Sequence, residues 1–133
     1  MRTYFIFNNL KVHPFFLSDG PFPGFKLLTW DHESWTYGTL LDIGNDAGFT
    51  PIGHYKVFGQ LWVADDMPKI TELEDLLGVN RGFMEPVKVL VNIETDVKEK
   101  VDAITYRLKN IPSNYGIVED GKWWIKTNKE MHK

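Results

Sequence analysis

The turn Asn8-Asn9-Leu10-Lys11 holds the first residues whose types could do chemistry, and it directly follows an apolar segment that ends at Phe7. Asparagine tolerates left-handed backbone angles, so Asn8-Asn9 can bend the chain sharply. A turn of this kind exposes backbone N–H groups, which bind anionic or carbonyl oxygens. The sequence therefore predicts an oxygen-binding turn with Phe7, Asn8, Asn9, Leu10 and Lys11 as ligand-binding candidates. An ordinary surface turn is the alternative interpretation.

Other common reaction centres lack their sequence patterns. The chain has no cysteine, which excludes disulfides, thiolate metal ligands and a cysteine nucleophile. Its four histidines lack metal-ligand spacing, and Asp31-His32-Glu33 is better interpreted as a solvated loop than as a cation site. No serine stands in a nucleophile elbow, and the glycine-bearing segment 44–48 is not followed by the Lys-Ser/Thr of a phosphate loop. We expect no metal site and no cofactor.

Aromatic residues and one glycine are further candidates for ligand contact. Residues 31–53 are predicted to form a long irregular segment, and such loops are usually functional. Within it, Trp35 and Tyr37 could wall a pocket or form a hydrophobic lid over the sheet. Gly59 interrupts a predicted strand, which indicates a bulge or a close approach to its backbone. Trp62 follows on the same strand and is a candidate pocket wall.

A sheet must position these residues. Apolar and alternating patterns predict strands over residues 3–7, 25–30, 54–64, 86–93 and 101–108. Asp65-Asp66 would cap a helix whose apolar stripe ends at Gly78. This order predicts an α+β domain, a small curled mixed β-sheet or barrel with one or two short helices. We expect a single domain over residues 1–124 and a polar tail over residues 125–133.

The composition fits one globular domain, with 133 residues of which 43% are hydrophobic and 25% charged. The aromatic fraction of 14% exceeds what a small core usually needs, which favours a pocket or a partner surface. A net charge of −3 argues against a nucleic-acid partner. The chain shows neither a signal peptide nor an 18-residue apolar segment, so we expect a cytoplasmic protein without a membrane partner. The oligomeric state stays open, a homo-oligomer included.

Several short motifs resemble, in order, those of the gamma-glutamylcyclotransferase-like family. They are Val57-Phe58-Gly59-Gln60-Leu61-Trp62, a helix with Leu73-Glu74-Asp75, and Gly121-Lys122-Trp123. The resemblance implies a small barrel-like α+β fold whose first strand ends in a substrate-binding turn, the position that Phe7 to Lys11 holds here. A literal Tyr37-Gly38-Thr39-Leu40 is interpreted as a decoy, because too few residues separate it from Val57 to hold the intervening strand and loops.

The departures from the family pattern bear on catalysis. The resemblance places the family's acid–base glutamate directly before the glycine that ends the helix, where this chain has Leu77. Leucine cannot carry the proton that cyclotransfer requires. If the chain is active, the resemblance leaves Glu85 or Glu74 as the replacement, although a helix-surface role is the simpler interpretation of Glu74.

The favoured hypothesis is a non-catalytic protein that sequesters or senses a small polar or anionic metabolite or a nucleotide-derived molecule. One alternative is an active gamma-glutamyl cyclotransferase that releases 5-oxoproline. Another is a protein-interaction module that uses the aromatic residues of segment 14–49.

Overall fold

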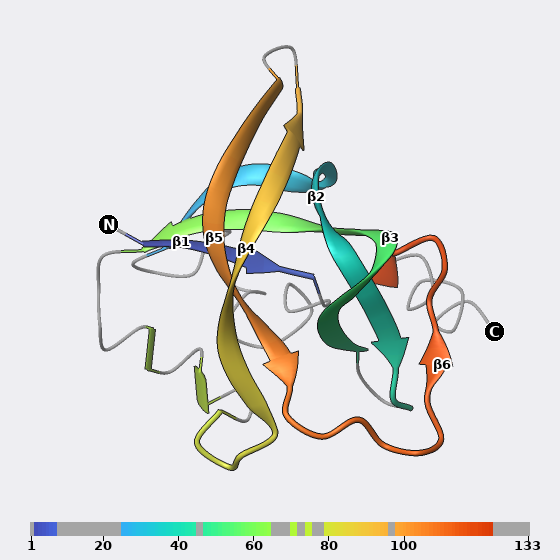
Figure 1. The fold of residues 1–133 in the computed structure, drawn as a ribbon. Coiled ribbons are helices and arrows are strands. Elements are labelled where there is room, and N and C mark those ends of the chain that lie inside the picture. The colour runs from blue at the N-terminus through green and yellow to red at the C-terminus, as the bar shows by residue number, and fades with distance from the viewer. Residues whose placement is uncertain are drawn as a thin grey trace, which may run out of the picture.

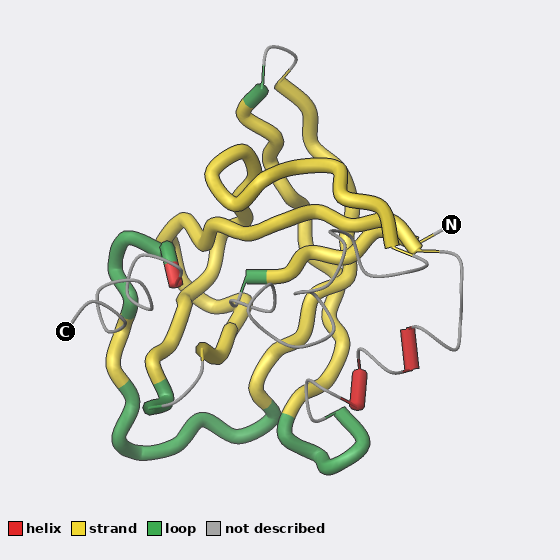
Figure 2. Tube along the Cα trace, turned by 180° about the vertical axis from the view of Figure 1, so that it is seen from behind, coloured by secondary structure: helices red, strands yellow, loops and turns green. Residues whose placement is uncertain are grey.

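The computed structural model describes residues 2–7, 25–44, 47–64, 70–71, 74–75, 79–95 and 98–123. Strands dominate this part of the chain (Figures 1 and 2). They are β1 (Arg2–Ile6), β2 (Phe25–Asp42), β3 (Ala47–Ala64), β4 (Met84–Glu94), β5 (Lys98–Leu108) and β6 (Gly116–Ile117).

The strands form one mixed sheet that curls into a near-barrel ring. Their order is β3-β1-β5-β4-β2-β6, and β2 pairs again with β3, which closes the ring. The pair β1–β5 is parallel, whereas the other described pairs are antiparallel. Figure 1 shows β4 and β5 as a long twisted hairpin that crosses β1 and β3. The prediction of a curled mixed sheet is therefore confirmed, whereas the described residues contain no helix as a continuous element, so the fold shown is mostly β instead of α+β.

The prediction of a long irregular segment over residues 31–53 is wrong, because strands β2 and β3 cover most of it. The β2–β3 ladder is interrupted between Leu27 and Thr29, between Thr29 and Ser34, and between Gly38 and Thr39. Such bulges add residues to one strand and shift its alternation of apolar and polar side chains. Buried hydroxyls stabilise the interruption, since Thr29 and Ser34 share a hydrogen bond of 2.8 Å and Ser34 donates to the Gly59 carbonyl. The alternation of apolar and polar residues is interrupted at these bulges, and the sequence therefore did not predict a continuous strand here.

Helical backbone occurs at residues 70–71 and 74–75, within the predicted helix. The Val79 N–H donates to the Glu74 carbonyl over 3.0 Å, a six-to-one hydrogen bond of the kind that ends helices. Leu77, Gly78 and the tail after Trp123 lie outside the described residues. Within the described residues, no helix is long and apolar enough to cross a membrane.

Strand β1 separates two hydrophobic clusters. Its side chains alternate, so Phe5 points into the barrel core while Tyr4 and Ile6 point to the opposite face. The barrel core also contains Phe7, Leu40, Phe49, Val57, Leu61, Val91, Ala103 and Trp123. The second cluster contains Trp62, Ala64, Ile70, Met84 and Tyr106. Burial on both faces fixes β1 at the centre of the fold.

Candidate functional site

Three buried aromatic rings lie side by side on the face of the sheet opposite the barrel core. Tyr4 of β1 faces Trp62 of β3 in the antiparallel ladder. The Tyr4 ring stacks with that of Tyr106 from β5, with ring centroids 6.5 Å apart and planes inclined by 7°. We call Tyr106, Tyr4 and Trp62 the aromatic row. Ile70 belongs to the same buried cluster as the row.

A carboxylate lies at the Tyr106 end of the aromatic row. The Tyr106 hydroxyl donates a hydrogen bond of 3.0 Å to Glu74 Oε2. Burial raises the pKa of the Tyr106 phenol above its ordinary value, and the negative charge and hydrogen bond of Glu74 raise it further. Tyr106 therefore stays protonated at neutral pH and acts as a hydrogen-bond donor, not as a base.

A buried amide lies at the Trp62 end of the row. The Gln60 side chain is only 7% exposed, and its Oε1 accepts a hydrogen bond of 3.1 Å from Trp62 Nε1. Within the part of the chain that the structure describes, no group accepts a hydrogen bond from the Gln60 amide nitrogen. Gln60 pairs with Ile6, so it lies beside the point where β1 ends and the predicted oxygen-binding turn begins. A buried donor without a partner costs about 1–3 kcal/mol, and it becomes satisfied when an oxygen atom binds there.

The residues predicted at the turn have different positions. The Phe7 side chain is 5% exposed and packs in the barrel core, 5.6 Å from Phe49 between ring centroids. Its side chain therefore points away from the aromatic row. Asn8, Asn9, Leu10 and Lys11 lie outside the described residues.

The close approach predicted at Gly59 is confirmed, and the approaching group is the protein's own backbone. A Cβ atom at Gly59 would lie 2.5 Å from the Ile6 carbonyl oxygen and 2.8 Å from the Phe5 ring. Only a glycine lets β1 pack this closely against β3. Gly59 thus positions the neighbouring Gln60 against the end of β1.

Trp35 and Tyr37 lie in another region, an open hollow of about 360 Å³ on the surface. Other residues of the hollow are Thr36, Pro51, Val89, Leu90, Asn92 and Lys100. None of these belongs to the aromatic row or its cluster. The sequence-predicted wall residues are therefore divided, with Trp62 in the buried row and Trp35 and Tyr37 in the hollow.

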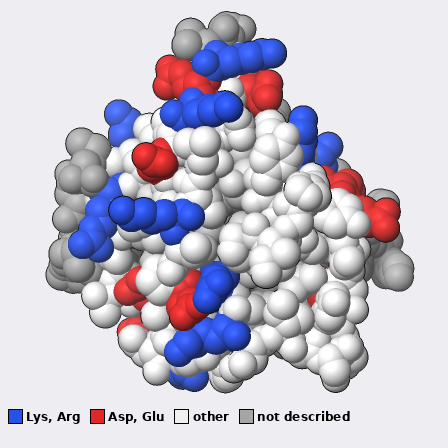
Figure 3. All heavy atoms as spheres, in the orientation of Figure 1, with Lys and Arg blue, Asp and Glu red and all other residues white. Residues whose placement is uncertain are grey.

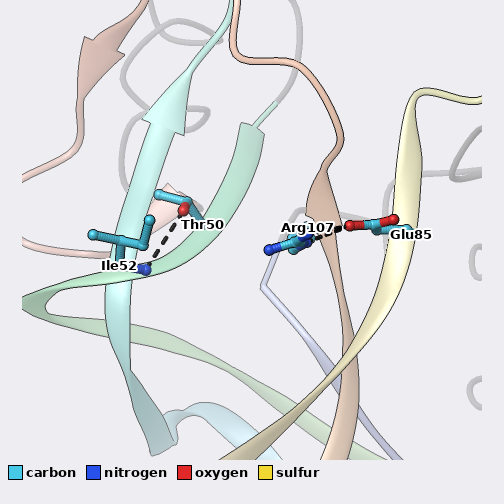
Figure 4. A network of polar contacts seen from close by, with 4 residues as sticks. All are labelled: Thr50, Ile52, Glu85 and Arg107. Atoms are coloured by element: carbon cyan, nitrogen blue, oxygen red, sulfur yellow. Dashed lines mark hydrogen bonds and ion pairs between the residues drawn. The ribbon is translucent and has the colours of Figure 1, made fainter.

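The two catalytic candidates are also separated. Glu85 of β4 forms an exposed ion pair with Arg107, its cross-strand neighbour on β5 (Figure 4). Figure 4 also shows the separate contact of the Ile52 N–H with Thr50 Oγ1. Because neighbouring residues of a strand face opposite sides, Glu85 faces away from Met84, which packs with the aromatic row. Glu74 alone of the two carboxylates contacts the row.

The sequence did not indicate Tyr4 or Tyr106 as site residues, and Gln60 stood out only within the motif that begins at Val57. The alternation of Tyr4 and Ile6 with Phe5 and Phe7 was a usable signal, because it predicts a strand buried on two faces. The hydrogen bond between Tyr106 and Glu74, 32 residues apart, had no sequence signal. Among the described residues, no three His, Asp or Glu side chains gather as metal ligands.

Comparisons with known proteins find similarity in structure alone. No family model matches the chain, and no curated protein has a significantly similar sequence. Uncharacterized protein PH0828 from Pyrococcus horikoshii is 15% identical with a TM-score of 0.66, over 99% of this chain and 98% of that chain. YkqA from Bacillus subtilis is 18% identical with a TM-score of 0.69, over 99% of this chain but only 43% of its own.

A third solved structure is described as a gamma-glutamyl cyclotransferase. It is 18% identical with a TM-score of 0.61, and the likeness covers 87% of this chain and 69% of that chain. A likeness at this identity concerns the backbone arrangement, because the same fold can carry unrelated activities. The chain therefore has the fold of gamma-glutamyl cyclotransferase, as its sequence motifs suggested.

Proposed function

We propose that this chain is a non-catalytic protein that binds, and thereby sequesters or senses, a small polar or anionic ligand. The binding site lies at the Gln60 end of the aromatic row. One observation carries the proposal: the Gln60 amide nitrogen is buried and lacks a hydrogen-bond acceptor among the described residues. Buried polar groups without a partner are rare in folded proteins and call for a functional explanation.

The chemistry of Gln60 selects the kind of ligand group. Its Oε1 is occupied by the Trp62 N–H, so the atom left for a ligand is a donor. A donor pairs with a carbonyl, carboxylate or phosphate oxygen. Strand β1 ends beside Gln60, and the turn that is predicted to follow it at Asn8-Asn9 would add backbone N–H groups of the same polarity. Both features favour an oxygen-rich, neutral or anionic metabolite.

The positions of the carboxylates support a function without cyclotransferase activity. The resemblance to the family places Leu77 where the acid–base glutamate is expected. Glu85, one substitute, lies in an exposed ion pair facing away from the row. Tyr106 is held in its protonated form and cannot take up a proton. Proton transfer at this site would depend on Glu74.

The alternative, an active gamma-glutamyl cyclotransferase, is favoured by the contact between Tyr106 and Glu74. This hydrogen bond holds a carboxylate at a fixed place at the end of the row opposite Gln60. Catalysis requires such positioning as well as the carboxylate itself. The alternative predicts that a gamma-glutamyl compound is converted to 5-oxoproline and that Glu74→Gln stops the conversion.

The test is a thermal-shift screen of the purified chain with gamma-glutamyl amino acids, 5-oxoproline and nucleotides, followed by mass spectrometry of the recovered compound. A ligand at a hundredfold excess over its dissociation constant stabilises the fold by about 2.7 kcal/mol, which is readily measured. We expect a shift with a compound that is recovered intact. Recovery of 5-oxoproline from a gamma-glutamyl compound would contradict the proposal and establish the alternative.

A matched pair of variants locates the site. Gln60→Glu keeps an acceptor for the Trp62 N–H but replaces the amide donor by a carboxylate, so it should abolish the shift caused by an anionic ligand. Asn114→Asp makes the same chemical change at an exposed position and should leave the shift unchanged. Equal shifts in both variants would show that the ligand does not bind at Gln60.

A further inference from the structure

The hollow that contains Trp35 and Tyr37 is separate from the aromatic row and has features of a second binding site. Its volume of about 360 Å³ is within the range of small-molecule sites. It lies where β2, β3, β4 and β5 meet, since Tyr37 pairs with Lys56, Trp35 pairs with Asn92, and Asn92 pairs with Lys100. These strands belong to the closed ring, so the walls of the hollow are held by the sheet.

The apolar wall of the hollow presents an exposed ring that is held in place from behind. Tyr37 is 56% exposed, and its ring packs edge-on against the Trp35 indole with centroids 4.9 Å apart. The indole itself is buried and fixed, because its N–H donates to Glu94 Oε1 over 3.1 Å. Leu90, which is 50% exposed, extends the apolar surface beside it. A flat ring could stack here without ordering a flexible side chain first.

The polar wall carries unused donors and positive charge. Neither the side-chain amide of Asn92 nor the ammonium group of Lys100 has a hydrogen bond or ion pair within the described part of the chain. Lys56 lies over the Trp35 ring, with its Nζ 4.4 Å from the ring centroid. Among the described residues that line the hollow, Lys100 alone is charged, and the nearby Glu94 carboxylate accepts the indole N–H. Figure 3 shows charged side chains gathered over the β4–β5 hairpin and a broad uncharged area beside them.

We propose that this hollow binds a small planar aromatic ring that carries one anionic group. The ring stacks on Tyr37 and packs against Leu90. The anionic group pairs with Lys100 and accepts a hydrogen bond from the Asn92 amide. A carboxylate and a phosphate meet these requirements equally, and the experiment separates them.

Three probes with one ring system test the proposal: 1-naphthoate, 1-naphthyl phosphate and the neutral 1-naphthamide. Each is titrated into the ¹⁵N-labelled chain while amide NMR signals are followed. We expect one or both anions to bind with a dissociation constant of about 1 mM or below, a modest affinity for ligands of this size. Signals of Tyr37, Leu90 and the Asn92 side chain should move together. The anion that binds more tightly identifies the preferred group, whereas equal binding of 1-naphthamide would overturn the requirement for a charge.

Matched lysine variants test whether the anionic group of the probe pairs with Lys100. Lys100→Ala should weaken binding of the preferred anion about tenfold, because it removes a charge-assisted hydrogen bond. Lys98→Ala removes the same charge from an exposed neighbour two residues away on β5 and should change binding less than twofold. Tyr37→Ala should weaken all probes, and Tyr37→Phe should restore binding because the ring is retained. Equal losses in the two lysine variants, or no binding of any probe, would overturn the proposal.

The outcome is independent of the function proposed for Gln60. Gln60→Glu lies outside the hollow and should leave naphthoate binding unchanged. Loss of probe binding in this variant would instead show that the probes occupy the aromatic row, which contradicts a site in the hollow.

Discussion

The aromatic row and the hollow contain similar residues in opposite environments. Trp62 in the row is 6% exposed, whereas Tyr37 in the hollow is 56% exposed. In the row, rings pack against neighbouring strands and stabilise the fold, and the polar atom of interest, on Gln60, is buried with them. In the hollow, the Tyr37 ring faces solvent, and the polar side-chain atoms of Asn92 and Lys100 keep contact with water.

This difference predicts two kinds of recognition. The Gln60 amide donor lost its contact with water when the protein folded. A ligand oxygen that accepts its hydrogen bond therefore stabilises the complex more than the same hydrogen bond would in water. A ligand in the hollow must instead displace water from both the ring and the charge. Binding in the row should therefore be selective for the position of one oxygen, and binding in the hollow should depend on ring area and charge.

The largest expected effect compares one aromatic residue from each region. Trp62→Ala should lower the free energy of unfolding by about 3–5 kcal/mol, because it opens a cavity beneath Tyr4 and Ile70. Tyr37→Ala removes a ring that faces solvent and should cost about 0.5 kcal/mol or less. Urea denaturation of the two variants measures both values. Similar losses would mean that the hollow also contributes to the core, and the comparison would fail.

The next effect concerns the contact that holds Gln60 in place. Gly59→Ala should destabilise the fold by about 1–3 kcal/mol, since the added methyl group meets the Ile6 carbonyl and the backbone must shift. Gly116→Ala is the control, because a Cβ there is 3.7 Å from its nearest neighbour, an ordinary contact. Its expected change is within about 0.5 kcal/mol. A stable Gly59→Ala variant would indicate that β1 and β3 are further apart than described.

The pH dependence of stability tests whether the Tyr106 phenol of the row is buried. An unfolded tyrosine loses its proton near pH 10, whereas the pKa of folded Tyr106 is raised by burial and by Glu74. Below pH 10, Tyr106 is protonated in both the folded and the unfolded state, and its full contribution to the free energy of unfolding is present. As the pH rises above 10, the unfolded state loses its proton first, and the free energy of unfolding falls by about 1.4 kcal/mol per pH unit.

Tyr106→Phe should remove this part of the slope that the wild type shows. Denaturation curves at pH 9, 10 and 11 measure the difference. If Tyr106→Phe retains the wild-type slope, the phenol is solvated and the row is more open than the structure indicates.

The smallest effect belongs to a carboxylate outside both regions. Glu85→Gln breaks an ion pair whose two side chains are 33% and 44% exposed, and such pairs contribute about 0–1 kcal/mol. We expect unchanged ligand binding at either site and a change in stability below about 1 kcal/mol, measured by denaturation and by the thermal-shift screen. Loss of turnover or of ligand binding in this variant would place Glu85 in a functional site and contradict its assignment to the surface.

The fold was more accessible to sequence reasoning than the site was. The strand patterns of segments 86–93 and 101–108 correspond to parts of β4 and β5, and the family resemblance led to the correct fold. The bulges of β2 defeated the pattern, because each inserted residue reverses the face of the residues that follow. Trp35 and Tyr37 were consequently assigned to a loop, although they lie on a strand.

The sequence by itself indicated a small curled mixed sheet, through its strand patterns and family resemblance, and its composition excluded cysteine chemistry. Gly59 indicated a bulge or a close approach, and the tertiary structure shows that the approaching group is the Ile6 carbonyl. Only the tertiary structure decided which side chains share a region: it brought Glu74 to Tyr106 and placed Trp62 beside Tyr4, while it separated Trp35 from both. The physical reason is that strand alternation assigns side chains to a face, whereas the pairing order and closure of the ring decide which faces of distant segments meet.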